Sequence, residues 1–117
     1  MPILYRADAN TEEGYPGILR TILVDAGRGA ASLWLGHLEI DPGASVTTHI
    51  HPDTEEAMVI LEGHLEAVLG DEVVTLGPGD TVLAPAGVKH GFVNRSGVKA
   101  TLLASFPKTT FQRVAAD

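Results

Sequence analysis

Two histidines separated by a single residue, His49 and His51, are the side chains in this sequence best suited to chemistry. Alternate residues of a β-strand project from the same face, so the two imidazoles would lie about 6–7 Å apart along a strand. Two carboxylates, Glu55 and Glu56, follow closely, and a third imidazole, His90, comes later. Imidazole and carboxylate groups together suit first-row divalent metal ions. The alternative is that the two histidines are exposed strand residues, because an isolated His-x-His pair is weak evidence for a metal site.

Four neighbours share a strand face with these candidate ligands and are predicted to line a pocket beside the ion. They are Thr47, Met58, Ile60 and Phe92. Ordinary core packing remains an alternative for each of them. Asn94 is expected to brace a turn through its side-chain amide.

The other two histidines, His37 and His64, are not predicted to be ligands. A solitary histidine needs partners to chelate an ion, and no second histidine lies near either of them in the sequence. His64 follows a turn and alternates with apolar residues, so we expect it to be exposed.

The elements that must position these residues are short strands. Glycine and proline separate short runs rich in Val, Ile, Leu and Thr, which is the rhythm of an all-β fold. Nine strands are predicted, in a sandwich or a small barrel. They are Gly17–Val24, Ser32–Ile40, Val46–His49, Ala57–Leu61, Leu65–Leu69, Val73–Leu76, Thr81–Ala84, Gly91–Val93 and Ala100–Phe106.

Composition narrows the class of protein. The chain has 117 residues, a length that suits one domain over residues 1–117, with 1–16 as an N-terminal arm or edge strand and 114–117 as a frayed tail. A formal net charge of −7 argues against nucleic acid or an anionic membrane as the main partner. The absence of cysteine excludes disulfides and thiolate chemistry. No transmembrane run or secretory signal is visible, so a cytoplasmic location is expected.

Two segments resemble the motifs of the cupin family. The first motif is a glycine, five residues, His-x-His, three or four residues, a glutamate, six residues and a glycine, and residues 43–63 match it throughout. The second is a glycine, five residues, Pro-x-Gly, two residues, a histidine, three residues and an asparagine, which residues 79–94 match. The resemblance implies a double-stranded β-helix, that is, a jelly-roll cupin barrel, and often a homodimer.

The resemblance also implies which side chains hold the ion: His49, His51, Glu56 and His90. The choice between Glu55 and Glu56 stays open on strand parity alone, because the Pro52-Asp53 turn interrupts the strand. Counting back from Gly63 in the motif selects Glu56. The cofactor is predicted to be one divalent transition metal ion, Fe, Mn, Ni, Zn or Cu.

A reaction does not follow from the family, since cupins include dioxygenases, isomerases, storage proteins and sensors. The main hypothesis is a small metal-dependent enzyme, dioxygenase- or isomerase-like, that acts on a small organic substrate in the barrel. The second is a non-catalytic metal-bearing module that binds or senses a small molecule. A metal-free structural or storage role is the third.

Overall fold

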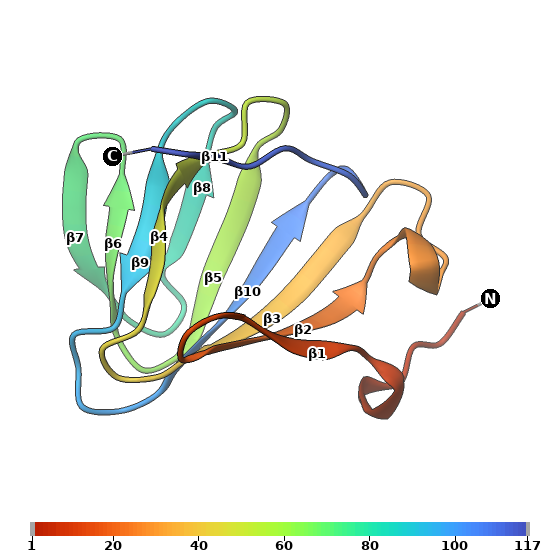
Figure 1. Ribbon diagram of the computed structural model, residues 1–117, viewed down its shortest axis with the longest axis horizontal. Helices are drawn as coiled ribbons and strands as arrows, with labels where there is room; N and C mark the ends of the chain where they lie inside the picture. Colours follow the sequence, from red (N-terminus) through yellow and green to blue (C-terminus); the bar gives the residue numbers. More distant parts are fainter. Residues whose placement is uncertain (1, 117) are drawn as a thin grey trace.

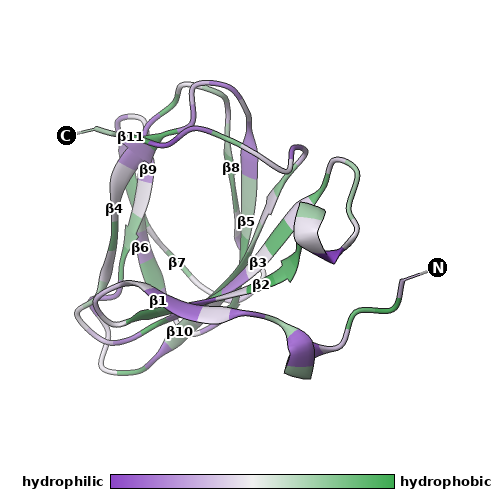
Figure 2. Cartoon of the chain, turned by 45° about the vertical axis from the view of Figure 1, so that its right-hand side comes forward, coloured by the Kyte–Doolittle hydropathy of each residue, from purple (hydrophilic) through white to green (hydrophobic). Residues whose placement is uncertain are grey.

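Two antiparallel β-sheets form the computed structural model, which describes residues 2–116 (Figure 1). The first sheet has the spatial order β1 (Thr11–Tyr15), β2 (Ile18–Val24), β3 (Trp34–Ile40), β10 (Ala100–Phe106), β5 (Glu56–Glu62) and β8 (Thr81–Ala84). The second has the order β11 (Val114–Ala115), β4 (Ser45–Ile50), β9 (His90–Val93), β6 (Leu65–Leu69) and β7 (Glu72–Leu76). The sheets wrap into an open barrel (Figure 2), which confirms the predicted all-β barrel.

All nine predicted strands are present, each within one or two residues of its expected bounds. The N-terminal segment supplies β1, an edge strand paired with β2. Two short 3₁₀ helices are present: η1 (Arg6–Asp8) precedes β1, and η2 (Ala26–Arg28) lies between β2 and β3. No helix in residues 2–116 has the length and apolar character needed to cross a membrane.

The C-terminal segment differs from the frayed tail expected over residues 114–117. Val114 and Ala115 form β11, which pairs with Ile50 and His49 of β4. The physical reason is anchoring just before the strand, where Arg113 donates hydrogen bonds to the Thr47 carbonyl and hydroxyl. Asp117 and Met1 lie outside the described residues.

Buried apolar side chains form one core cluster inside the barrel. Ile18 and Ala100 both pair with Ile40, and all three side chains are completely buried. On β5 the buried residues alternate with partly exposed ones, as expected for a strand with one face in the core. This packed core supports the strands that carry the candidate ligands.

Gly63 shows why the first motif ends in glycine. The residue has φ +77°, a conformation that residues with a side chain rarely adopt. A Cβ atom there would lie 2.8 Å from the Lys99 carbonyl oxygen, because the β5–β6 turn passes against the segment that leads into β10. The turn after β5, the strand that begins with Glu56, thus requires glycine for two independent reasons: its positive φ and the lack of space for a Cβ atom.

Candidate metal centre

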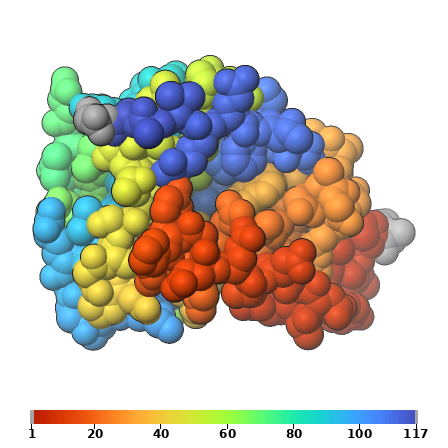
Figure 3. Space-filling model, viewed as in Figure 1, coloured from red at the N-terminus to blue at the C-terminus, as the bar shows by residue number. Residues whose placement is uncertain are grey.

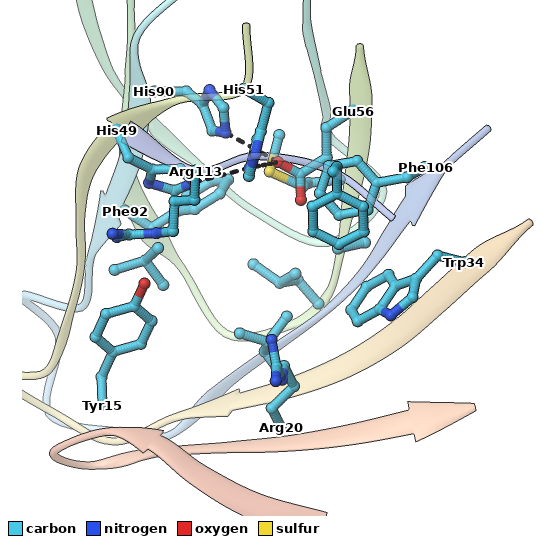
Figure 4. Close-up of a pocket in the computed structure, with 16 residues that line it drawn as sticks. Tyr15, Arg20, Trp34, His49, His51, Glu56, His90, Phe92, Phe106 and Arg113 are labelled. Atoms are coloured by element: carbon cyan, nitrogen blue, oxygen red, sulfur yellow. Dashed lines mark hydrogen bonds and ion pairs between the residues drawn. The ribbon is translucent and has the colours of Figure 1, made fainter. Parts of the chain in front are cut away.

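Three histidines and one glutamate converge inside the barrel (Figure 4). His49 lies near the end of β4, His51 just after it, and Glu56 and His90 are the first residues of β5 and β9. One donor atom from each lies within 4.8 Å of every other. All four side chains are buried, with exposed fractions between 2% and 7%. The structure thus brings together all four residues predicted as metal ligands.

Backbone carbonyls orient all three imidazoles in the same way. The Nδ1 atom of His49 lies 2.7 Å from the Thr47 oxygen, that of His51 lies 2.6 Å from the Gln112 oxygen, and that of His90 lies 3.0 Å from the oxygen of Val88. A carbonyl only accepts hydrogen bonds, so each Nδ1 carries a proton and donates it. In a neutral imidazole the other nitrogen, Nε2, then presents a lone pair.

These lone pairs face one another, which is the feature that a cation fits. The Nε2 atoms of His49 and His51 lie 3.1 Å apart, and Nε2 of His90 lies 2.9 Å from a carboxylate oxygen of Glu56. Two acceptors at such a distance need a proton or a metal ion between them. Buried polar atoms left unsatisfied cost about 1–3 kcal/mol each. The donor set therefore fits a divalent transition metal ion held by neutral imidazoles and one carboxylate.

The protonation preferences of the ligands differ. Burial lowers the pKa of His49 to about 4, and the positive charges of His90 and Arg113 act in the same direction. Burial also acts to lower the pKa of His51, but its hydrogen bonds with Glu56 and the Gln112 carbonyl outweigh this and raise it. For Glu56, burial is outweighed by the contacts with His51 and His90, so the pKa of the carboxyl is lowered and it stays ionised.

Metal occupancy should therefore fall as the pH is lowered. In the protein without metal, the raised pKa means that His51 binds a proton at a higher pH than an ordinary histidine does. A metal ion must displace that proton to bind. Because the pKa of His51 is raised from 6.5, we expect apparent affinity to fall by about tenfold per pH unit once the pH drops below that raised value. His49, with a pKa of about 4, competes only in stronger acid. Elemental analysis after dialysis from pH 8 to pH 5 measures this, and constant metal content would contradict histidine ligation.

The structure separates the two adjacent carboxylates. Glu56 is buried and lies 2.9 Å from Nε2 of His90 and 3.4 Å from Nε2 of His51. Glu55 is exposed. The Pro52-Asp53 turn separates His51 from β5, so strand parity counted from His51 does not carry across it. The geometry thus favours Glu56 over Glu55 as the carboxylate ligand.

Matched variants at these two positions distinguish the carboxylates. We expect Glu56→Gln to weaken metal binding by at least about 100-fold, the upper end of the loss seen when only an outer partner of a ligand is removed. Glu55→Gln should bind metal as the unmodified protein does. Competition with a calibrated chelator gives both affinities. Loss of metal from Glu55→Gln alone would show that the wrong carboxylate has been assigned.

The ligands form one side of a pocket with an empty volume of about 620 Å³, its open mouth included. Met58 and Phe92 line it, as predicted. Ile60 is a core residue, 1% exposed, further along β5. Thr47 is exposed, and Val46 lines the pocket in its place.

An irregularity in β4 explains the error at Thr47. The ladder between β4 and β9 shifts register between Val46 and His49. Such a bulge breaks strict alternation, so the inward face passes from Val46 to His49 and leaves Thr47 outside. Gly91 lies at this point, where a Cβ atom would come within 2.8 Å of the Val46 carbonyl oxygen.

Several pocket residues come from parts of the chain that the sequence does not connect with the site. They are Tyr15, Arg20, Trp34, Phe106, Phe111 and Arg113. Figure 3 shows the C-terminal segment and the β1–β2 hairpin meeting over one face of the molecule. The sequence gives no local signal for this contact, because the two segments lie far apart in the chain and meet only in the folded barrel. His37 and His64 lie outside the ligand cluster, and His64 is exposed.

Asn94 acts as the brace predicted for it. The amide nitrogen donates to the carbonyls of Ile40 at 2.9 Å and Val98 at 2.8 Å. The amide oxygen accepts from the backbone N–H of Ser96 at 3.0 Å and from its hydroxyl at 2.7 Å. The last residue of the second motif therefore fixes the turn after β9 and does not reach the pocket.

The family follows from the match of the chain to known proteins. The family model described as the cupin domain matches residues 36–106, more than half of the chain. The chain belongs to the cupin family. This cupin is 34% identical over 87 residues to the tetracenomycin polyketide synthase protein TcmJ of Streptomyces glaucescens, a match that covers 74% of the chain and 58% of TcmJ. The matches to TcmJ and to two further relatives, protein SchB of Streptomyces halstedii and polyketide synthase CurC of Streptomyces cyaneus, span only 56% to 63% of the lengths of those proteins.

Solved structures give the same fold. A sugar phosphate isomerase of the cupin superfamily from Silicibacter pomeroyi has a TM-score of 0.85 at 27% identity, covering 99% of this cupin and 82% of that chain. The polyketide cyclase RemF from Streptomyces resistomycificus has a TM-score of 0.82 at 28% identity, covering 100% and 87%. The cupin barrel fold therefore extends over essentially the whole chain.

Proposed function

We propose that this cupin is a metal-dependent enzyme, dioxygenase- or isomerase-like, that acts on a small organic substrate inside the barrel. The observation that carries the proposal is the convergence of three Nε2 lone pairs and one ionised carboxylate beside a pocket. The names of the similar proteins, a polyketide cyclase and a sugar phosphate isomerase, support catalysis on small molecules.

The chemistry of the donor set supports the same role. A divalent ion held by His49, His51, Glu56 and His90 supplies Lewis acidity and, where the metal is redox-active, the means to activate oxygen. Three neutral imidazoles and one carboxylate leave a net charge of +1 on such an ion, which attracts oxygen-bearing substrate groups. Buried Met58 and Phe92 exclude water from one side of the site.

Within residues 2–116, Glu56 is the one carboxylate that lines the pocket. The pocket therefore has no pair of carboxylates that could act as separate acid and base. Apart from the four candidate metal ligands, its titratable groups are Tyr15, Arg20 and Arg113. This observation also favours the second candidate, a module that binds a small molecule without turning it over.

The experiment that tests the proposal has two parts. Elemental analysis of protein purified without an affinity metal column is expected to give close to one divalent transition metal ion per chain. Turnover is then assayed with candidate catechols, diketones and sugar phosphates, before and after EDTA. Loss of turnover with EDTA and recovery with metal support an enzyme. Full metal content with a stable ligand complex and no turnover supports the binding module, and a metal-free protein contradicts both.

Assembly and location stay predictions of the sequence. The homodimer carried over from the family resemblance is checked by size-exclusion chromatography with light scattering, which distinguishes one chain from two. The cytoplasmic location is checked by fractionation of cells that express the native protein.

A further inference from the structure

One pocket gathers nearly all of the aromatic side chains of this protein. The sequence has one Trp, two Tyr and three Phe, and all of these except Tyr5 line the pocket. Phe106 and Phe111 stack with ring centroids 3.8 Å apart, and Trp34 meets both edge-on at 5.4 and 5.6 Å. Aromatic faces and edges of this kind favour contact with another flat, unsaturated ring.

Two arginines line the same pocket, although the chain as a whole is acidic. The net charge of the chain is −7, yet the lining has Arg20 and Arg113 against the single carboxylate of Glu56. A bound divalent ion would add two further positive charges. The pocket therefore concentrates positive charge within a negatively charged protein, and an anion is the ligand that such a field selects.

Arg113 keeps its charge available. The guanidinium donates to the neutral carbonyl and hydroxyl oxygens of Thr47, at 3.3 and 3.0 Å, and lies 5.1 Å from the centre of the Tyr15 ring. No carboxylate pairs with it among residues 2–116. In Figure 4 the Tyr15 hydroxyl points toward Arg113, which places a second hydrogen-bonding group beside this cation.

Arg20 has a donor without an acceptor. A terminal nitrogen of its guanidinium pairs with Glu12 at the exposed side, and the group lies 5.9 Å from the centre of the Trp34 ring. Its Nε atom is buried and has no hydrogen-bond partner within the described chain. A buried N–H of a charged group without a partner is costly, so an oxygen atom of a ligand would be a favourable acceptor.

We propose that Arg113 is the centre of an anion-binding subsite, with Arg20 as a second cation in the same lining, and that the ligand is a flat, unsaturated organic acid whose carboxylate Arg113 holds. The ring packs against the aromatic side chains, and the remaining oxygen-bearing end reaches the histidine cluster. This inference rests on the proposed function only in taking the pocket as the substrate site. It names the class of substrate as aromatic or conjugated carboxylates.

The test compares three ligands of similar size by isothermal titration calorimetry on the full chain, as purified and again with EDTA. They are 2-naphthoate, its neutral isostere 2-naphthamide, and the saturated acid decalin-2-carboxylate. We expect the naphthoate to bind about tenfold or more tightly than the amide, because charge-assisted hydrogen bonds are lost. It should also bind about 3- to 10-fold more tightly than the saturated acid, because aromatic contacts are lost.

Variants assign the effect to residues. Arg20→Gln and Arg113→Gln are each expected to weaken naphthoate binding about tenfold and to leave naphthamide binding unchanged. The matched control is Arg95→Gln, because Arg95 pairs with Glu66 on the surface and does not line the pocket. Since Arg113 also anchors β11, circular dichroism checks the fold of each variant.

Equal affinity for the acid and the amide in the unmodified protein would overturn the anion subsite, whatever the variants do. Equal affinity for the flat and saturated acids would overturn the flat-ring part. Both comparisons are judged on the titrations with EDTA, where no ion can hold the carboxylate, and neither requires turnover, so a failure of the subsite is distinguishable from a failure of the proposed enzyme. If both arginine variants still bind naphthoate more tightly than naphthamide by the same factor as the unmodified protein, neither arginine holds the carboxylate.

Discussion

Replacing His90 with alanine is expected to leave the purified protein with far less than one divalent metal ion per chain. His90 is 2% exposed, and its Nε2 atom lies 2.9 Å from a Glu56 oxygen, at the centre of the donor group. The cavity left by the ring could admit water, but water does not reproduce an imidazole held in place by the Val88 carbonyl. We expect at least about a 100-fold loss of metal affinity, and the same for His49→Ala and His51→Ala.

His64→Ala is the matched control, because His64 is exposed and lies outside the donor group. Inductively coupled plasma mass spectrometry on dialysed protein measures the metal content of all four variants. Circular dichroism against metal-free unmodified protein separates loss of ligand from loss of fold. A folded His90→Ala protein that retains one ion per chain would remove His90 from the metal site.

The largest effect on stability is expected from Asn94→Ala, at about 3 kcal/mol in the free energy of unfolding. The side chain is completely buried and makes four hydrogen bonds. Its removal leaves the carbonyl of buried Ile40 without this donor and the Val98 carbonyl with the Ser96 hydroxyl, and an unsatisfied buried group costs about 1–3 kcal/mol. Urea denaturation of metal-free protein measures the change.

A second substitution at the same position makes the interpretation specific. Asn94→Asp keeps the acceptor for Ser96 but replaces the donor with an oxygen that faces the carbonyl oxygens, so it should destabilise at least as strongly as alanine. Asn10→Ala, at an exposed position, is expected to change the unfolding free energy by less than about 0.5 kcal/mol. A small effect of both Asn94 variants would show that the turn after β9 holds without the amide.

Much of the fold could be predicted because local signals determine it. Strands such as Leu65–Leu69 and Thr81–Ala84 are bounded by turn residues on both sides, and their predicted limits match the structure. The four clustered residues could be named because residues 43–63 and 79–94 resemble the two cupin motifs, in which the ligands stand at fixed distances from glycines such as Gly63. The same local signals give no information about segments that pair only across the barrel.

The errors have physical causes at the level of tertiary structure. Alternation predicts that Thr47 faces the pocket, but the bulge in β4 displaces it. No residue type in this stretch of sequence indicates a bulge. The pairing of β11 with β4 depends on Arg113 and on the packing of Phe111, neither of which marks a strand locally. Arg20 reaches the pocket only because β2 lies beside β3 in the finished sheet.

The register that sets His49 opposite His90 also couples ion binding to folding. An unfolded chain offers an ion little more than the His-x-His pair, since His90 and Glu56 are 34 residues apart in the chain. Free ion therefore draws the equilibrium toward the native state, and each tenfold rise in its concentration above the dissociation constant adds about 1.4 kcal/mol of stability. In a cell, the abundance of this protein would then follow the supply of its metal, because starved chains spend more time exposed to proteases.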